Sequence, residues 1–158
     1  MAEFPAINTS PLIFLTKGNC LSLLQAVSEK VIVPEAVATE VQAYGNSDVT
    51  AQALAKTEWL IIKETPSIPS LIQSWDLGPG ESAVLSWGYS YGGSEVIIDD
   101  LMGRRCAEAL KIPVRGTLGI VLLAKQQGVI SKARPILEML KQSGMYLSEN
   151  VLSEALKL

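Results

Sequence analysis

The hydrophobic residues of this 158-residue chain fall into two alternating patterns. Short apolar runs, most of them rich in valine and isoleucine, predict buried strands at residues 4–7, 30–34, 59–64, 95–99 and 113–116. Between these runs, apolar positions recur every three or four residues, which predicts helices. The expected helices cover residues 10–18, 19–28, 34–45, 48–56, 78–92, 101–112, 117–128, 132–144 and 148–158, with a loop and a short helix within 67–80.

Proline and glycine support these boundaries. Pro11 and Pro135 suit the first turn of a helix, where the missing N–H is not needed. Gly18 and Gly45 follow the last periodic residue of their helices, the usual place for a stop.

The regular alternation of strands and helices predicts an α/β fold. Buried parallel strands need crossover helices, so we expect a three-layer domain with a parallel sheet of about five strands flanked by helices on both faces. The length of 158 residues fits a single domain spanning residues 1–158. In open sheets of this kind, sites form beyond the carboxyl ends of the strands.

Composition removes several classes of chemistry. The chain contains no histidine, which excludes Ser-His-Asp and Cys-His catalysis and most zinc sites. No phosphate-binding P-loop pattern occurs. Any catalysis must therefore use carboxylates, hydroxyls, lysine or a cofactor.

The chain also shows no sign of export or membrane insertion. No apolar stretch approaches the roughly 20 residues that span a bilayer, and residues 1–10 lack the pattern of a signal peptide. Cys20 and Cys106 match no metal-binding spacing, so we expect buried, reduced thiols. These features predict a cytoplasmic protein.

Charge is distributed unevenly around a net value of −3. Residues 1–100 hold 4 Lys and Arg against 12 Asp and Glu, a net charge of −8, whereas residues 101–158 hold 9 against 4, a net charge of +5. An acidic cluster beside a basic strip suits a metal-dependent enzyme acting on a polyanion. Solvated helix faces are the alternative interpretation.

Polar side chains from four separate segments are expected at one end of the sheet. Asn8 ends the first strand, and Asp99 with Asp100 ends the fourth. Glu40 lies in the helix after the second strand, and Glu81 opens the helix that leads into the fourth. If they converge, Mg²⁺ or Mn²⁺ is the natural counter-charge, because hard cations prefer oxygen ligands.

Each of these residues also has a structural interpretation. Asn8 and either aspartate suit a helix N-cap, Glu81 suits the positive end of a helix dipole, and Glu40 suits a solvated surface. The stretch GPGESA resembles a dinucleotide-binding loop, but no strand directly precedes it, and Glu81 would face the pyrophosphate. A glycosidase with two carboxylates stays open, although nothing marks a sugar cleft.

Several stretches, taken in order, carry a family resemblance. They are INTSPLIFLTKGNCLSLL, KVIVPEAVATEV, GPGESAVL, VIIDDLMGRRCAEALKIPVRGTLGIVLLAKQQGVI and ILEMLKQSGMYLSENVLSEAL. Together they resemble a PIN-like subfamily labelled DUF3368, over nearly the whole chain. The resemblance implies a five-stranded parallel sheet and Mg²⁺- or Mn²⁺-dependent ribonuclease activity, as in the toxins of bacterial toxin–antitoxin pairs.

The resemblance also assigns site residues. Asn8 stands where PIN nucleases usually have aspartate, with Thr9 and Ser10 after it. The acids of the family fall on Glu40, on Glu81 and on Asp99 or Asp100, which the spacing does not distinguish. The implied metal ligands are Asn8, Glu81, Asp99 and Asp100, and the implied catalytic set adds Glu40.

Substrate contacts are expected from Thr9 and Ser10 and from basic residues beyond the acids. The candidates for holding RNA phosphates are Arg104, Arg105, Arg115 and Lys125, and solvated helix surface is their alternative. Because Asn8 removes one negative charge, a weak or inactive PIN-like module that binds nucleic acid or a protein is the alternative to a metal-dependent endoribonuclease. A third hypothesis is a partner-regulated subunit whose apolar helices form a dimer. The resemblance further implies a small antitoxin partner and a homodimer.

Overall fold

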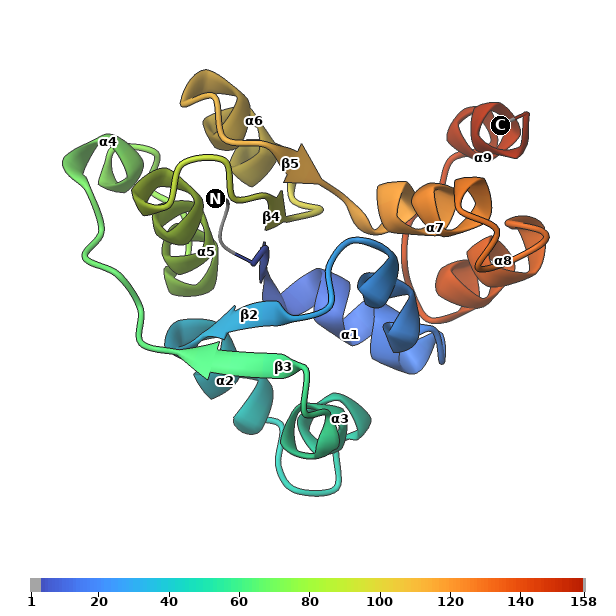
Figure 1. Ribbon diagram of the computed structural model, residues 1–158, viewed down its shortest axis with the longest axis horizontal. Helices are drawn as coiled ribbons and strands as arrows, with labels where there is room; N and C mark the ends of the chain where they lie inside the picture. Colours follow the sequence, from blue (N-terminus) through green and yellow to red (C-terminus); the bar gives the residue numbers. More distant parts are fainter. Residues whose placement is uncertain (1–3, 158) are drawn as a thin grey trace.

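The computed structural model describes residues 4–157 and contains a parallel sheet (Figure 1). Within these residues the sheet has five strands in the order β3-β2-β1-β4-β5, all parallel. The strands are β1 (Ala6–Ile7), β2 (Val31–Pro34), β3 (Leu60–Lys63), β4 (Val96–Ile97) and β5 (Val114–Arg115). The expected α/β fold is therefore confirmed.

The helices follow the periodic pattern of the sequence closely. They are α1 (Thr9–Lys17), α2 (Glu35–Gln42), α3 (Val49–Lys56), α4 (Ser70–Gln73), α5 (Pro79–Ser90), α6 (Leu101–Ala109), α7 (Thr117–Gln126), α8 (Arg134–Gln142) and α9 (Glu149–Leu156). Leu158, the last residue of the expected final helix, lies outside the described residues.

The second expected helix, at residues 19–28, differs from the others. It forms a 3-10 helix, η1 (Leu21–Ala26), rather than a second α-helix. Asn19, which precedes it, has a φ of 55°, in the left-handed region that asparagine tolerates better than most residues. The chain therefore turns sharply between α1 and η1.

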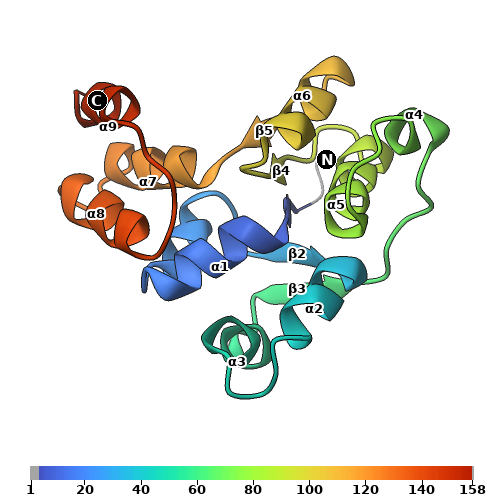
Figure 2. The same cartoon turned by 180° about the vertical axis from the view of Figure 1, so that it is seen from behind.

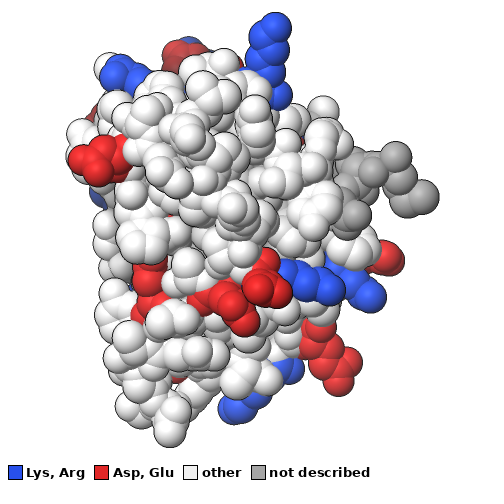
Figure 3. Space-filling view, turned by 90° about the vertical axis from the view of Figure 1, so that its left-hand side faces the viewer, with Lys and Arg blue, Asp and Glu red and all other residues white. Residues whose placement is uncertain are grey.

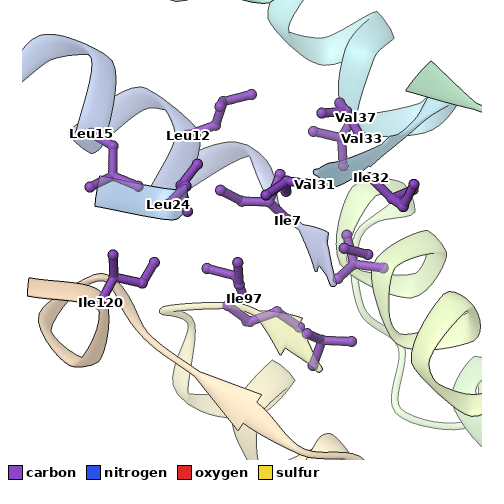
Figure 4. Close-up of a cluster of buried hydrophobic side chains, with 14 of the residues drawn as sticks. Ile7, Leu12, Leu15, Leu24, Val31, Ile32, Val33, Val37, Ile97 and Ile120 are labelled. Carbon is purple, nitrogen blue, oxygen red and sulfur yellow. The ribbon is translucent and has the colours of Figure 1, made fainter. Parts of the chain in front are cut away.

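The core lies around the central strands. Ile7 pairs in register with Ile97, and both side chains are fully buried. Figure 4 shows them in a cluster that also takes Leu15 from α1, Leu24 from η1 and Ile120 from α7. Two-residue strands are held in place here by helices packed around them rather than by long hydrogen-bond ladders.

Helices flank the sheet and are grouped at two opposite ends of the molecule (Figures 1 and 2). α5 packs across β1, β2 and β4 and against α2, α4 and α6, while α1 packs against α2, α3, α7 and α8. Figures 1 and 2 show α4 and α5 at one end and α7, α8 and α9 at the other. In residues 4–157, no helix has the length and apolar character that a membrane crossing needs.

The two cysteines are free and buried, as expected. Burial raises the pKa of the Cys20 thiol to about 11 and also raises the pKa of the Cys106 thiol. Both groups are therefore protonated thiols at neutral pH and poor nucleophiles.

Candidate metal-binding site

The central strands end in polar residues at one edge of the sheet. Asn8 follows β1 directly, and Asp99 and Asp100 come shortly after β4. The Asn8 backbone N–H donates to the carbonyl oxygen of Ile97 at 3.0 Å, which ties the two strand ends together. Because β1 and β4 are parallel neighbours, these polar residues lie on the same side of the molecule.

Asn8 occupies the first position before α1, but its side chain does not cap the helix. The residue is only 6% exposed. A β-carbon added at Gly80 would lie 3.3 Å from Asn8 Oδ1 and 2.5 Å from Glu40 Oε1, so both oxygens face the same point. The amide is therefore directed toward an acidic side chain instead of the start of its own helix.

Glu40 is exposed but firmly positioned. Thr9 Oγ1 donates to Glu40 Oε2 at 2.8 Å, and the backbone N–H of Gly80 donates to Glu40 Oε1 at 3.1 Å. These bonds join α2 to the first turns of α1 and α5. Glycine at position 80 permits this close approach, since a β-carbon there would lie 2.5 Å from Glu40 Oε1 and the carboxylate would have to move.

Glu81 lies in the first turn of α5 and has an unusual environment. Its Oε2 is a buried side-chain oxygen with no hydrogen-bond partner among the described residues. A β-carbon added at Gly103 would lie 2.9 Å from Glu81 Oε2 and 3.8 Å from Asp100 Oδ2, so these carboxylates share one region. A buried carboxylate oxygen without a donor is costly and needs an explanation.

The proton affinity of Glu81 reflects this crowding. Burial, the negative charge of Asp100, a hydrogen bond shared with Asp100 and the negative charge of Glu40 raise the pKa of Glu81 to about 7. Glu81 thus feels the negative charge of both Asp100 and Glu40, with Asp100 the larger effect. Perturbed carboxylates of this kind are common at functional sites.

The tandem aspartates have different contacts. Asp100 is the N-cap of α6 and accepts a hydrogen bond from the Gly103 N–H through Oδ2 at 3.0 Å. Asp99 instead accepts two bonds from Thr117, at 2.7 Å from its N–H and at 2.6 Å from its hydroxyl. The structure therefore places Asp100 with Glu81 and directs Asp99 to the start of α7.

Acidic side chains also gather more widely at this edge. Glu35 follows β2 directly and Glu64 follows β3. Figure 3 views the side on which β2 and β3 end and shows acidic side chains across the middle of a mostly uncharged face, with a few basic ones beside them. This distribution favours the approach of cations.

The residues expected to contact the substrate differ in their hydrogen-bond partners and in their exposure to solvent. Arg115 forms an ion pair with Glu95, with Nε 2.7 Å from Oε1, so its guanidinium already has a partner. Arg104 donates to the carbonyl oxygen of Ile98 at 3.1 Å, and Arg105 is exposed. Ser10 is exposed in the first turn of α1, next to the Thr9 that holds Glu40.

The donor set fits a hard divalent cation that keeps several waters. No group of three or more His, Cys, Asp or Glu side chains within residues 4–157 is arranged to hold a metal ion. However, Glu81 and Asp100 provide two adjacent carboxylates, one with a buried oxygen that lacks a donor. Mg²⁺ commonly binds proteins through only one or two carboxylates.

A comparison with known protein families shows to which family this chain belongs. The model of a family described as a PIN domain, DUF3368, matches residues 5–158. The chain belongs to the PIN-domain family. The resemblance read from the sequence is thus confirmed, together with the three-layer α/β fold around a five-stranded parallel sheet.

PIN-domain membership indicates a nuclease-type fold and a nucleic-acid substrate, and PIN domains generally use divalent metals. No curated protein matches the chain. Finer assignments therefore depend on the geometry of this PIN domain.

Sequence reasoning missed the glycines that shape the site. Gly80 and Gly103 lie against the carboxylates of Glu40 and Glu81. One signal was available, because Gly103 lies within the first turn of a predicted helix, where glycine is unfavourable and usually has a packing reason. The contact between Asp99 and Thr117 had no comparable signal.

Proposed function

We propose that this PIN domain is a Mg²⁺- or Mn²⁺-dependent endoribonuclease. One observation supports the proposal: Glu81 and Asp100 lie together, and among residues 4–157 the buried Oε2 of Glu81 has no hydrogen-bond partner. Asn8 Oδ1 and Glu40 Oε1 lie together beside Gly80, the residue before Glu81. Without a cation, backbone and hydroxyl donors offset the charge on Glu40 and Asp100, and the raised pKa of Glu81 lets it keep a proton. The nuclease-type fold indicated by the family supports the same interpretation.

The residues have distinct parts in the proposed mechanism. Glu81 and Asp100 would hold the metal, with Asn8 Oδ1 as a neutral ligand. Glu40, fixed by Thr9 and Gly80, would add negative charge and orient water beside the site. A bound divalent cation would supply Lewis-acid stabilisation of the phosphate and a more acidic water ligand. Asp99 would act through Thr117 as a positioning residue.

Cleavage of a labelled single-stranded RNA tests the proposal. We expect Mn²⁺- or Mg²⁺-dependent cleavage that EDTA abolishes. Glu81→Gln and Asp100→Asn should each lower the rate about 100-fold or more, because each removes a charge that holds the metal. Glu29→Gln, an exposed acid that precedes β2 at the opposite end of the strand from the site, is the matched control and should leave the rate unchanged.

The result that would contradict the proposal is cleavage that continues at the native rate in both variants. Calorimetric titration with Mn²⁺ gives an independent measurement. The native chain should bind the ion, and a chain carrying both Glu81→Gln and Asp100→Asn should not.

A second function, nucleic-acid binding with weak or no cleavage, is favoured by one observation. The buried ligand position after β1 carries the neutral amide of Asn8, and no three acidic groups of the described chain are arranged around an ion. Asn8→Asp restores the missing charge. If the native chain is inert and this variant cleaves RNA, the binding function is correct; if the native chain already cleaves, it is not.

The toxin role extends the proposed activity. It predicts that expression of the chain arrests growth, that Asp100→Asn relieves the arrest, and that a small antitoxin protein co-purifies with the native chain. A homodimer is the further expectation, which light scattering of the purified chain would test. The support for these partners is the family resemblance.

A further inference from the structure

A groove begins beside the acidic site and extends to the C-terminal part of the chain. It has a volume of about 700 Å³ and starts at Asp99, Arg104 and Gly116. Its walls come from α7 and from the segment that precedes and begins α9, with Leu122 on one side and Val151 on the other. Figures 1 and 2 both show α9 beside α7, beyond the end of β5.

The side chain of Tyr146 also lines this groove and is 86% exposed, more than any other large hydrophobic residue described. A tyrosine ring so exposed contributes little to the core, so the fold alone does not explain it. Its neighbours Met145 and Leu122 make the groove beside the ring apolar. A flat apolar ligand could therefore lie between the ring and the wall.

The other end of the groove carries donors. Arg104 Nη1 donates to the Ile98 carbonyl oxygen, and in the described part of the chain Arg104 has no ion-pair partner. A guanidinium has five N–H donors, so most of them stay available. A β-carbon added at Gly116 would lie 2.8 Å from Arg104 Nη1 and 3.0 Å from Asp99 Oδ1, so only glycine lets the guanidinium and this carboxylate approach the backbone here.

We propose that this groove binds one nucleotide of the substrate, with its base against Tyr146 and Arg104 donating to its phosphate. This inference rests on the proposed function, because the endoribonuclease proposal is what identifies the ligand as RNA. A nucleotide combines a flat π face with an anionic group. The groove offers the Tyr146 ring at its outer end for the base and the Arg104 guanidinium near the acidic site for the phosphate. The volume also fits one small ligand.

Binding to an RNA that contains a single abasic position tests the proposal without requiring catalysis. The Asp100→Asn chain, kept in EDTA, is titrated against a fluorescently labelled single-stranded RNA. Tyr146→Ala on this background should weaken binding about tenfold, the usual size of a lost base–aromatic stack. Tyr146→Phe, which keeps the ring, should bind like its parent, as should Tyr44→Ala, which removes another exposed tyrosine.

The abasic RNA separates stacking from other effects. An abasic nucleotide at the stacked position should weaken binding to the parent chain about tenfold and have little further effect on Tyr146→Ala. Unchanged RNA affinity in Tyr146→Ala overturns the proposal. The proposal also fails if Tyr146→Ala weakens binding of intact RNA and of every abasic RNA by the same factor, wherever the abasic nucleotide is placed. Unchanged RNA affinity with loss of self-association would instead make the groove a contact between two copies.

The outcomes also distinguish this inference from the proposed nuclease function. RNA binding that depends on Tyr146, in a native chain that does not cleave, supports the groove and rejects the nuclease. Metal-dependent cleavage with native RNA affinity in Tyr146→Ala supports the nuclease and rejects the groove.

Discussion

At the scale of single residues, the position of Glu81 has the strongest consequences. Most acids of a folded protein are stabilised in their charged form, but Glu81 is half-buried near the negative charges of Asp100 and Glu40 and holds its proton more tightly than usual. One of its carboxylate oxygens has no hydrogen-bond partner among residues 4–157. Charging this group in the metal-free protein must therefore cost stability.

Glu81 should make the metal-free protein less stable as pH rises. Its pKa is raised from 4.5 to about 7, so between these values the folded chain binds more protons than the unfolded chain. The free energy of unfolding then falls as pH rises through this range, and the loss is complete above pH 7. Thermal unfolding in EDTA between pH 5 and 8 measures this trend.

Glu81→Gln is the variant that isolates this effect. It should flatten the pH dependence and raise the melting temperature near pH 8, where the native group is charged. Glu35→Gln should keep the native profile, since that acid is exposed. A native slope that persists in Glu81→Gln would show that another group causes it.

At the scale of elements, the start of α7 depends on the end of β4. Asp99 accepts hydrogen bonds from both the N–H and the hydroxyl of Thr117, and Thr117 is fully buried. The carboxylate also lies at the positive end of the α7 dipole. One side chain therefore connects the end of β4 to a helix that lines the groove.

Thr117→Val should destabilise the protein by about 2 kcal/mol, because it leaves a charged acceptor without its hydroxyl partner while keeping the side-chain shape. Urea unfolding measures the change, with Thr39→Val on the exposed face of α2 as the control. Asp99→Asn should destabilise as well. In the double variant the two losses should not add, and additive losses would contradict a direct interaction.

At the scale of the whole molecule, the short strands imply a single cooperative unit. Ile97 is fully buried in a core that takes side chains from α1, η1, α7 and the sheet. Both ends of the molecule therefore depend on the same packed centre. We therefore propose that the chain folds as one domain, as expected from its length for residues 1–158, because a single core connects both ends.

Ile97→Ala should lower the free energy of unfolding by about 2–5 kcal/mol, through lost burial and the cavity that remains. Circular dichroism and tryptophan fluorescence should report the same unfolding midpoint, as expected for one domain. Val129→Ala, at an exposed position, should change stability by less than about 0.5 kcal/mol. Two separate midpoints would contradict the single-domain prediction.

The sequence predicted the fold well because hydrophobic periodicity determines elements locally. The run VIIDD predicted both a buried strand and acids at its end, and the rule on carboxyl ends placed Asn8 and Glu81 nearby. The sequence did not distinguish Asp99 from Asp100, since both follow the same strand. Their difference depends on Thr117, 18 residues further on, whose position only the folded chain determines.

The divergence of these two aspartates has a consequence for how this segment tolerates length changes. Successive residues of an extended segment face opposite ways, so two neighbouring carboxylates avoid each other while each anchors the start of a different helix. Deleting or inserting one residue between Ile98 and Leu101 would turn each carboxylate to the opposite side. The start of α7 would then lose its hydrogen bonds to Asp99, and Glu81 would lose the neighbouring carboxylate of Asp100. We therefore expect evolution to substitute side chains here but to preserve the spacing.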